Sequence, residues 1–365
     1  MQKIYKHSHF KADAFGHGGH KRTAQISSLL ADSGIAFQEA LLENKALYRD
    51  KLSLYLRGLN YTQTIRNGHT SKYAIGRYLR LFEQFAEEAK PDLLLWESTV
   101  GYNVLLAEVL YKKNIPVIGL PHNIESLVSG SRSVFSNKIS PDWLPEELKY
   151  LRYCDQVFTI SAEEQWLLAN AGIHAAFLPY YPAPETVQYL LNIRERRQNG
   201  YTGTKKQKKL LLLGTFYNKP TAGGYIELLS QIRAFKDIEI HVAGFGSEQL
   251  SAIFTGANIN IWGTVSNEKL ADLITLADYG LIHQQASSGS LTRIPELLLA
   301  GLPLLLNSHA ARSCYDKMGV QIYRSFEELE DLLHSQTACI PPAAGRPAEE
   351  GLFIDYIRQK ISLQA

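Results

Sequence analysis

The chain has 365 residues, of which 45% are hydrophobic and 20% charged, and its formal net charge is +2. This length suits two globular domains, and the small net charge gives no general reason to expect nucleic acid as a partner. The three cysteines are far apart and lack metal-ligand spacing, which indicates reduced thiols in a cytoplasmic protein. No apolar run is long enough to cross a bilayer.

A glycine-rich loop follows the first expected strand, at residues 4–10. The loop, FGHGGHK at 15–21, leads into a helical pattern, and Gly18 and Gly19 would let a ligand come close to the backbone. A plain turn is the alternative. Because Lys21 stands where a third glycine would complete the dinucleotide-binding fingerprint, we expect no nicotinamide cofactor. The two histidines of the loop lack a further ligand at a supporting spacing, so we expect no metal site.

Residues 45–85 combine Lys and Arg with Tyr and Phe, and their pattern predicts two helices. Residues 1–80 as a whole hold thirteen Lys or Arg and five Asp or Glu. Two interpretations stay open: an anionic membrane surface or anionic acceptor bound by this segment, and an ordinary solvated helix face with partly buried Tyr rings. The segment carries no nucleic-acid recognition motif, so no nucleic-acid partner is expected.

A regular alternation of strands and helices follows. Strands are expected at residues 92–96, 116–120 and 157–160, with helical patterns between them. Such an alternation predicts a parallel sheet with helices on both faces, and ligands bind such sheets at the carboxyl ends of the strands. His122 and Asn123 stand at one of these ends. A functional pair and a capping pair at the edge of the core are equally good interpretations.

A polar stretch at residues 192–209 is expected to be an exposed linker, after which the alternation starts again. The strands of this half are expected at 210–213, 238–243, 259–262 and 279–283. Small and polar residues follow the first and third of them, namely Gly214, Thr215 and Lys219, and then Gly263, Thr264 and Val265. The sequence thus predicts a second open parallel sheet, and a cleft between two such domains is a favoured ligand site.

The stretch SSGSLTRIPELLLAGLP at 287–303 has the features of a phosphate-binding turn. Small residues, among them Gly289 and Ser290, lead into a short helix whose first turn offers free backbone N–H groups and the positive end of the helix dipole. Arg293 would add a cation, and Glu296 a carboxylate that accepts hydrogen bonds from a ribose diol. The plain alternative is a tight loop with a helix cap and a surface ion pair.

Several motifs occur in an order that resembles a known family. In the second half they are GTF, HVAGFG, IWGTVSNEKL, ADYGLIHQ and GSLTRIPELLLAGLPLL, and LPHNIES and CDQVFTIS in the first half agree with them. Together they resemble the retaining glycosyltransferases of family 4. The resemblance implies the GT-B fold, an α/β architecture in which two Rossmann-like parallel-sheet domains face each other across a cleft.

The resemblance also implies a division of the chain. Residues 1–190 would form the N-terminal acceptor-binding domain and residues 191–208 a linker. Residues 209–345 would form the C-terminal nucleotide-sugar-binding domain. Residues 346–365 would form a last helix that could cross back to the N-terminal domain.

Roles for individual residues follow from the same resemblance. His122 resembles the active-site histidine near the donor sugar, and Arg293 and Lys219 would stabilise negative charge on the departing diphosphate. Glu296 resembles the second Glu of a Glu-x7-Glu motif, which holds the ribose hydroxyls. Ser288 stands where the first Glu would be, which leaves the handling of the sugar hydroxyls open. The other implied donor-binding residues are Gly289, Ser290, Gly214, Thr215, Gly263, Thr264, Val265, Gly18 and Gly19.

The main hypothesis is a retaining, metal-independent glycosyltransferase with no obligatory cofactor. It would move a sugar from a UDP- or GDP-linked donor to a glycan or lipid-linked acceptor in surface polysaccharide synthesis. The protein would be cytoplasmic and peripheral at the inner face of the membrane, through residues 45–85. Two alternatives stay open: a nucleotide-sugar epimerase of the same fold, and a non-catalytic sugar-nucleotide-binding or partner subunit, which Ser288 suggests.

Overall fold

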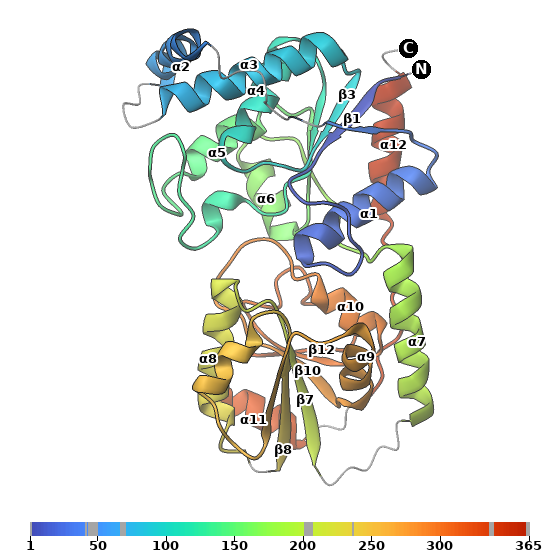
Figure 1. Ribbon diagram of the computed structural model, residues 1–365. Helices are drawn as coiled ribbons and strands as arrows, with labels where there is room; N and C mark the ends of the chain where they lie inside the picture. The colour runs from blue at the N-terminus through green and yellow to red at the C-terminus, as the bar shows by residue number, and fades with distance from the viewer. Residues whose placement is uncertain are drawn as a thin grey trace.

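The computed structural model describes residues 2–40, 42, 50–65, 71–200, 207–235, 237–335 and 339–362. Each half of the chain forms a six-stranded sheet in which all paired strands are parallel. Figure 1 shows the two sheets in separate lobes, each covered by helices. The predicted α/β class with two Rossmann-like parallel sheets is therefore confirmed.

The N-terminal sheet has the strand order β2-β1-β3-β4-β5-β6. Its strands are β1 Ile4–His7, β2 Gln38–Glu39, β3 Leu93–Trp96, β4 Val117–Gly119, β5 Gln156–Thr159 and β6 Ala175–Phe177. All four residues of β3 are buried, because helices cover both faces of the sheet. The strand order reverses between β1 and β3, which makes their carboxyl ends the expected place for a ligand.

Two groups of helices cover this sheet. One face carries α1 Gly18–Asp32 and α12 Glu349–Ser362, and the other carries α3 Lys72–Ala89, α4 Leu105–Lys112 and α5 Leu144–Leu151. The remaining elements are α2 Lys51–Ile65, which packs on α3, α6 Ala162–Asn170, and the 3₁₀ turns η2 Gly101–Val104 and η3 Glu125–Leu127. The last helix of the chain, α12, packs on the N-terminal lobe (Figure 1). The centroids of the Phe353 and Phe158 rings are 5.0 Å apart there.

The C-terminal sheet has the order β12-β11-β10-β7-β8-β9, which is the 3-2-1-4-5-6 order of dinucleotide-binding folds read from the other edge. Its strands are β7 Lys208–Leu213, β8 Ile238–Ala243, β9 Ile259–Gly263, β10 Tyr279–Ile282, β11 Leu304–Asn307 and β12 Val320–Tyr323. Its helical elements are α7 Pro184–Gly200, α8 Lys219–Ile232, η4 Ser247–Ala252, α9 Asn267–Leu276, α10 Arg293–Leu299 and α11 Phe326–Ser335. The order reverses between β7 and β10.

The expected exposed linker at 192–209 is wrong for its first part, because α7 continues as a helix to Gly200. Arg194 and Arg197 of this helix are buried. Arg194 donates to the carbonyls of Leu298 and Leu299, and Arg197 to that of Gly301. Two guanidinium groups thus satisfy the carbonyls at the end of α10, and α7 packs on the C-terminal lobe. Residues 201–206 lie outside the described residues.

Two further expectations concern the N-terminal half. The two helices expected within 45–85 are confirmed as α2 and α3, whereas residues 45–49 and 66–70 lie outside the described part. The expected glycine-rich loop at 15–21 is partly wrong, because Gly18 and Gly19 form the first turn of α1. The His17 side chain caps this turn by accepting a hydrogen bond from the Gly19 amide. Among the helices that the structure describes, none is long and apolar enough to cross a membrane.

Candidate functional site

The loops that follow the strands of the two sheets meet at the junction of the lobes. Ser288, after β10, donates from Oγ to the carbonyl of Ile124, after β4, at 3.3 Å. Ser313, after β11, accepts from the Ala162 amide, after β5, at 2.9 Å. The carboxyl ends of the two sheets therefore face each other, which is where open parallel sheets bind ligands.

Arg293 lies at the reversal point of the C-terminal sheet, between the ends of β7 and β10. Its Nη2 donates to Oε1 of Gln284 at 3.1 Å, and the same oxygen accepts from Thr221 at 3.1 Å. Its Nε is buried and has no hydrogen-bond partner among the described residues. A Cβ at Gly214 would lie 2.8 Å from Cγ2 of Thr221 and 3.4 Å from Nη1 of Arg293, so the backbone of Gly214 packs closely against both side chains. Burial lowers the pKa of Arg293, yet an arginine stays charged at neutral pH.

Three glycines pack the ends of β7, β8 and β9 together. The Gly214 amide donates to the Ala243 carbonyl, and the Gly244 amide donates to the Gly263 carbonyl. Gly244 has a φ of +125°, and a Cβ there would lie 2.0 Å from the Gly214 oxygen. The structure therefore brings Gly214 and Gly263 close together at the carboxyl end of the C-terminal sheet.

Four other expected donor-site residues lie in the loops that follow these strands or at the start of α8. Thr215 follows Gly214 and is half-buried, and Lys219 is exposed at the first position of α8. Thr264 is exposed and Val265 is half-buried after the end of β9. Their side chains are thus open to a ligand, whereas Arg293 sits deeper in the fold.

Glu296 connects the two lobes. Its Oε2 accepts from Lys21 Nζ at 2.6 Å, and its Oε1 accepts from the Tyr180 hydroxyl at 2.7 Å. The Glu296 side chain is 9% exposed and that of Lys21 19%. The expected diol-binding carboxylate thus already carries a cation and a hydroxyl from the N-terminal half, and a ribose would have to replace one of them.

The amide of Gly289, expected to be free for a phosphate, is engaged in this structure. It donates to Oε1 of Glu164 at 2.9 Å, and the Ile124 amide donates to the same oxygen at 2.9 Å. Gly289 has a φ of +72°, and a Cβ there would lie 2.1 Å from Asn123 Oδ1, so the close approach requires glycine. Ser290 follows and is half-buried. The loop therefore meets a carboxylate of the opposite lobe.

Arg312 fixes the backbone of the same loop. Its Nε donates to the Gly289 carbonyl at 2.7 Å, and its Nη2 donates to the Ser288 carbonyl at 3.0 Å. Burial lowers the pKa of Arg312, and the charge of Glu164 acts in the opposite direction. Arg312 thus holds two carbonyls of this loop and adds positive charge to the junction.

His122 is oriented by a buried carboxylate. Its Nε2 lies 3.3 Å from Oε2 of Glu97, which directly follows β3, and the same oxygen accepts from Thr23 at 2.7 Å. Burial would raise the pKa of Glu97, but the hydrogen bond from His122 and the charge of Lys6 outweigh it and bring this pKa to about 2. Glu97 is therefore ionised at neutral pH and holds the imidazole in one orientation, as acid–base histidines require.

The start of α1 also reaches the junction. A Cβ at Gly18 would lie 3.4 Å from Thr292 Oγ1, just before α10, and one at Gly19 would lie 2.4 Å from the Phe10 ring. The Phe10 ring lies 5.4 Å from that of His122. Gly18 and Gly19 thus permit close packing between α1, the first loop and the C-terminal lobe.

Sequence reasoning missed five charged or polar residues of the junction: Lys21, Glu97, Glu164, Tyr180 and Arg312. Only Glu97 carried a visible signal, since it directly follows a buried apolar strand. Glu164 was notable only as an acidic residue in the first turn of α6. Their partners lie far away in the sequence, so no local pattern identifies them. Among the described residues, no cluster of histidine, cysteine and acidic side chains forms a metal site.

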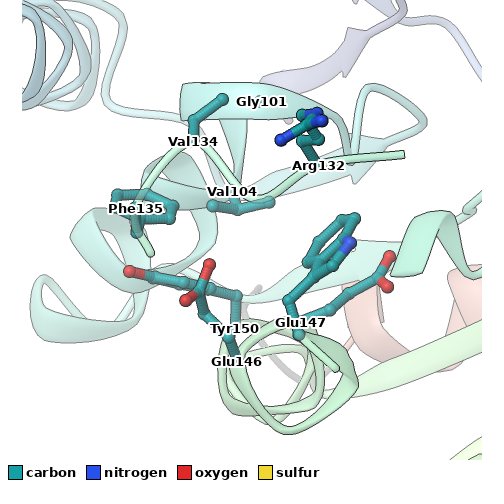
Figure 2. Close-up of a pocket in the computed structure, with 9 residues that line it drawn as sticks. Gly101, Val104, Arg132, Val134, Phe135, Glu146, Glu147 and Tyr150 are labelled. Carbon is teal, nitrogen blue, oxygen red and sulfur yellow. The ribbon is translucent and has the colours of Figure 1, made fainter. Parts of the chain in front are cut away.

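A separate small pocket lies in the N-terminal lobe (Figure 2). Its lining comes from η2, from the loop after η3 and from α5: Gly101, Val104, Arg132, Val134, Phe135, Trp143, Glu146, Glu147 and Tyr150. Glu147 accepts hydrogen bonds from the amides of Glu125 and Ser126, and burial raises its pKa to about 7. The pocket therefore combines aromatic rings with acceptor oxygens.

No protein-family model matches the chain, and no curated protein matches it in sequence. Solved structures share its fold. Sucrose-phosphate synthase from Thermosynechococcus elongatus has a TM-score of 0.63 at 12% identity, over 100% of both chains. HepE of Anabaena in complex with UDP and glucose has a TM-score of 0.57 at 13% identity, over 99% of this chain and 98% of its own. UDP-GlcNAc 2-epimerase from Methanocaldococcus jannaschii has a TM-score of 0.50 at 14% identity, over 98% and 100%. These likenesses establish the two-domain GT-B fold.

Proposed function

We propose that the protein is a retaining, metal-independent glycosyltransferase that uses a UDP- or GDP-linked sugar. The observation that carries the proposal is the buried Nε of Arg293, at the reversal point of the C-terminal sheet, which has no hydrogen-bond partner in the described part of the chain. A buried donor without an acceptor costs free energy unless a ligand satisfies it. A diphosphate supplies such an acceptor.

Stabilisation of the negative charge on the leaving diphosphate is the main source of catalysis in this proposal. Breaking a glycosyl–phosphate bond leaves negative charge on the diphosphate, which Arg293 and the exposed Lys219 would stabilise. Gly263, Thr264 and Val265 would hold the base at the rim. His122, oriented by Glu97, would contact the donor sugar at the junction. Glu296 would hold the ribose hydroxyls after exchanging one of its present partners.

The acceptor belongs to the N-terminal lobe in this proposal, within residues 1–190, and the donor to residues 209–345. The acceptor in this proposal is a glycan or a lipid-linked glycan. The last helix, α12, would keep its place on the acceptor lobe during the reaction.

Release of nucleoside diphosphate from a panel of UDP-, GDP- and dTDP-sugars tests the proposal. We expect turnover with one donor class, and a loss of at least about 100-fold in kcat/KM in Arg293→Met, because removing a charged transition-state donor costs about 3 kcal/mol. Analysis of the product anomer checks retention. Turnover of no donor, together with binding of one, would favour a non-catalytic sugar-nucleotide subunit, which the engaged Gly289 amide also favours.

An anionic membrane surface is part of the proposal for α2 and α3. Leu52, Tyr55 and Leu56 of α2 are exposed on neighbouring turns, and Arg80 of α3 is exposed close in sequence to the half-buried Arg77. Apolar and basic side chains together suit a peripheral helix at anionic lipids. Sedimentation with phosphatidylserine vesicles should weaken with salt and in the double variant Arg77→Glu, Arg80→Glu. Equal sedimentation of the variant and the wild type would contradict the proposed membrane binding by α2 and α3.

A further inference from the structure

Glu164 is a carboxylate that the transfer chemistry above does not use. It lies in the first turn of α6, is 3% exposed, and reaches the opposite lobe. Its Oε1 accepts the amides of Ile124 and Gly289, at 2.9 Å each. Its Oε2 is buried and has no hydrogen-bond partner among the described residues. One oxygen thus fixes the side chain across the junction, and the other is left to accept a donor.

The loop that Glu164 contacts lacks a carboxylate that could accept hydrogen bonds from sugar hydroxyl groups. From Ser287 to Thr292 it contains no carboxylate, and it offers amides, hydroxyl groups and then Arg293. Amides and a guanidinium suit phosphate oxygens, whereas the hydroxyl groups of a sugar are best held by ionised acceptors. A nucleotide sugar bound at this loop therefore needs an acceptor that the loop itself does not supply.

We propose that Glu164 binds a hydroxyl group of the donor sugar through its Oε2 and so determines which sugar is accepted. The inference rests on the proposed function. Oε1, held by two amides, positions the carboxylate beside Ser288 and Gly289, and an incoming hydroxyl satisfies Oε2, which no described residue pairs with. Burial raises the pKa of Glu164 to about 7, and the two amides and Arg312 lower it in part, so the group is ionised in a growing fraction of molecules above neutral pH.

The neighbouring Glu163 provides a matched control. It belongs to the same turn of α6 and also crosses to the other lobe, where it accepts from the amide of Ser313 at 2.7 Å and from its hydroxyl. Unlike Glu164, it makes no hydrogen bond with the loop at 288–289 that the structure records, and its contact is exposed. If substitution at either glutamate only weakens the junction, variants of Glu163 and of Glu164 should behave alike. If Glu164 binds the sugar, only the variant of Glu164 should lose affinity for it.

Calorimetric titration with UDP, UDP-glucose, GDP and GDP-mannose at pH 8 tests the inference. In Glu164→Gln the Kd of the bound nucleotide sugar should rise about 10- to 100-fold, since a hydrogen bond to a charged group contributes about 1.5–3 kcal/mol. The Kd of the matching nucleoside diphosphate should change less than about 2-fold, and Glu163→Gln should change neither value. Equal weakening of both ligands, or no weakening of the sugar nucleotide, would overturn the inference.

Two further results keep the test decisive. Wild type that binds none of the four probes contradicts the proposed function, whereas wild type that binds them with no selective change in Glu164→Gln contradicts this inference alone. If Glu164→Gln does not fold, deoxy analogues of the bound nucleotide sugar give the answer on wild type. Removal of the hydroxyl that Glu164 holds should raise the Kd about 10-fold, and unchanged Kd values for every deoxy analogue overturn the inference.

Discussion

The substitution Glu164→Gln should change how stability depends on pH. The usual pKa of a glutamate is 4.5, and burial raises that of Glu164 to about 7 in the folded protein. Between these values the folded state holds the proton more tightly than the unfolded state, so stability falls as pH rises through this window. From pH 5 to pH 8 the loss is about 2.5 kcal/mol, because each tenfold change in proton affinity corresponds to about 1.4 kcal/mol.

Glutamine does not titrate, so the variant escapes this loss. The stability of Glu164→Gln relative to wild type should rise by about 2 to 3 kcal/mol from pH 5 to pH 8, measured by urea unfolding at both values. The control Glu163→Gln should show no such rise. Burial alone would raise the pKa of Glu163, but hydrogen bonds from Ser313 outweigh it and lower the pKa, so this group is ionised at both pH values. A difference between Glu164→Gln and wild type that is the same at pH 5 and pH 8 refutes the reasoning.

Three substitutions test the packing that shapes the site. Phe353→Ala should destabilise the protein by about 3–5 kcal/mol, because its ring is fully buried; an unchanged urea midpoint contradicts the docking of α12. Gly244→Ala should lower the thermal midpoint, since φ is +125° and a Cβ would lie 2.0 Å from a backbone oxygen. Gly351→Ala should not, because the new Cβ would have no neighbour from another part of the described structure within 4 Å. Lys21→Met leaves Glu296 without its cation, so we expect a loss of about 1–3 kcal/mol and a larger radius of gyration by X-ray scattering; an unchanged radius shows that this ion pair does not hold the lobes together.

The fold could be predicted from the sequence because its signals are local. Strands such as Leu93–Trp96 are short apolar runs between helical patterns, and their alternation specifies parallel sheets. The exception is the stretch after Asn192, whose many charged residues indicate a linker. Arg194 and Arg197 are buried there because they satisfy backbone carbonyls at the end of α10, about a hundred residues further along the chain. Composition alone does not carry that information.

The candidate site could be predicted in part, where its residues belong to locally recognisable elements. Gly214 and Arg293 belong to a strand end and a turn that local patterns locate, and the sheet order brings them together. The ionic contacts across the junction involve residues far apart in sequence, as in the pair of Lys21 with Glu296. The engagement of Gly289 by a carboxylate depends on how the lobes dock, which periodicity and spacing do not determine.

Calorimetric titration of wild type and Arg293→Met with UDP and GDP would show whether the carboxyl end of the C-terminal sheet binds a nucleotide. We expect micromolar binding of one nucleotide by wild type. We also expect at least about 10-fold weaker binding by the variant, because the charged donor at the reversal point of the C-terminal sheet is removed. Equal affinity of variant and wild type, or binding of neither nucleotide by wild type, would contradict the claim that this edge of the sheet is a nucleotide-sugar site.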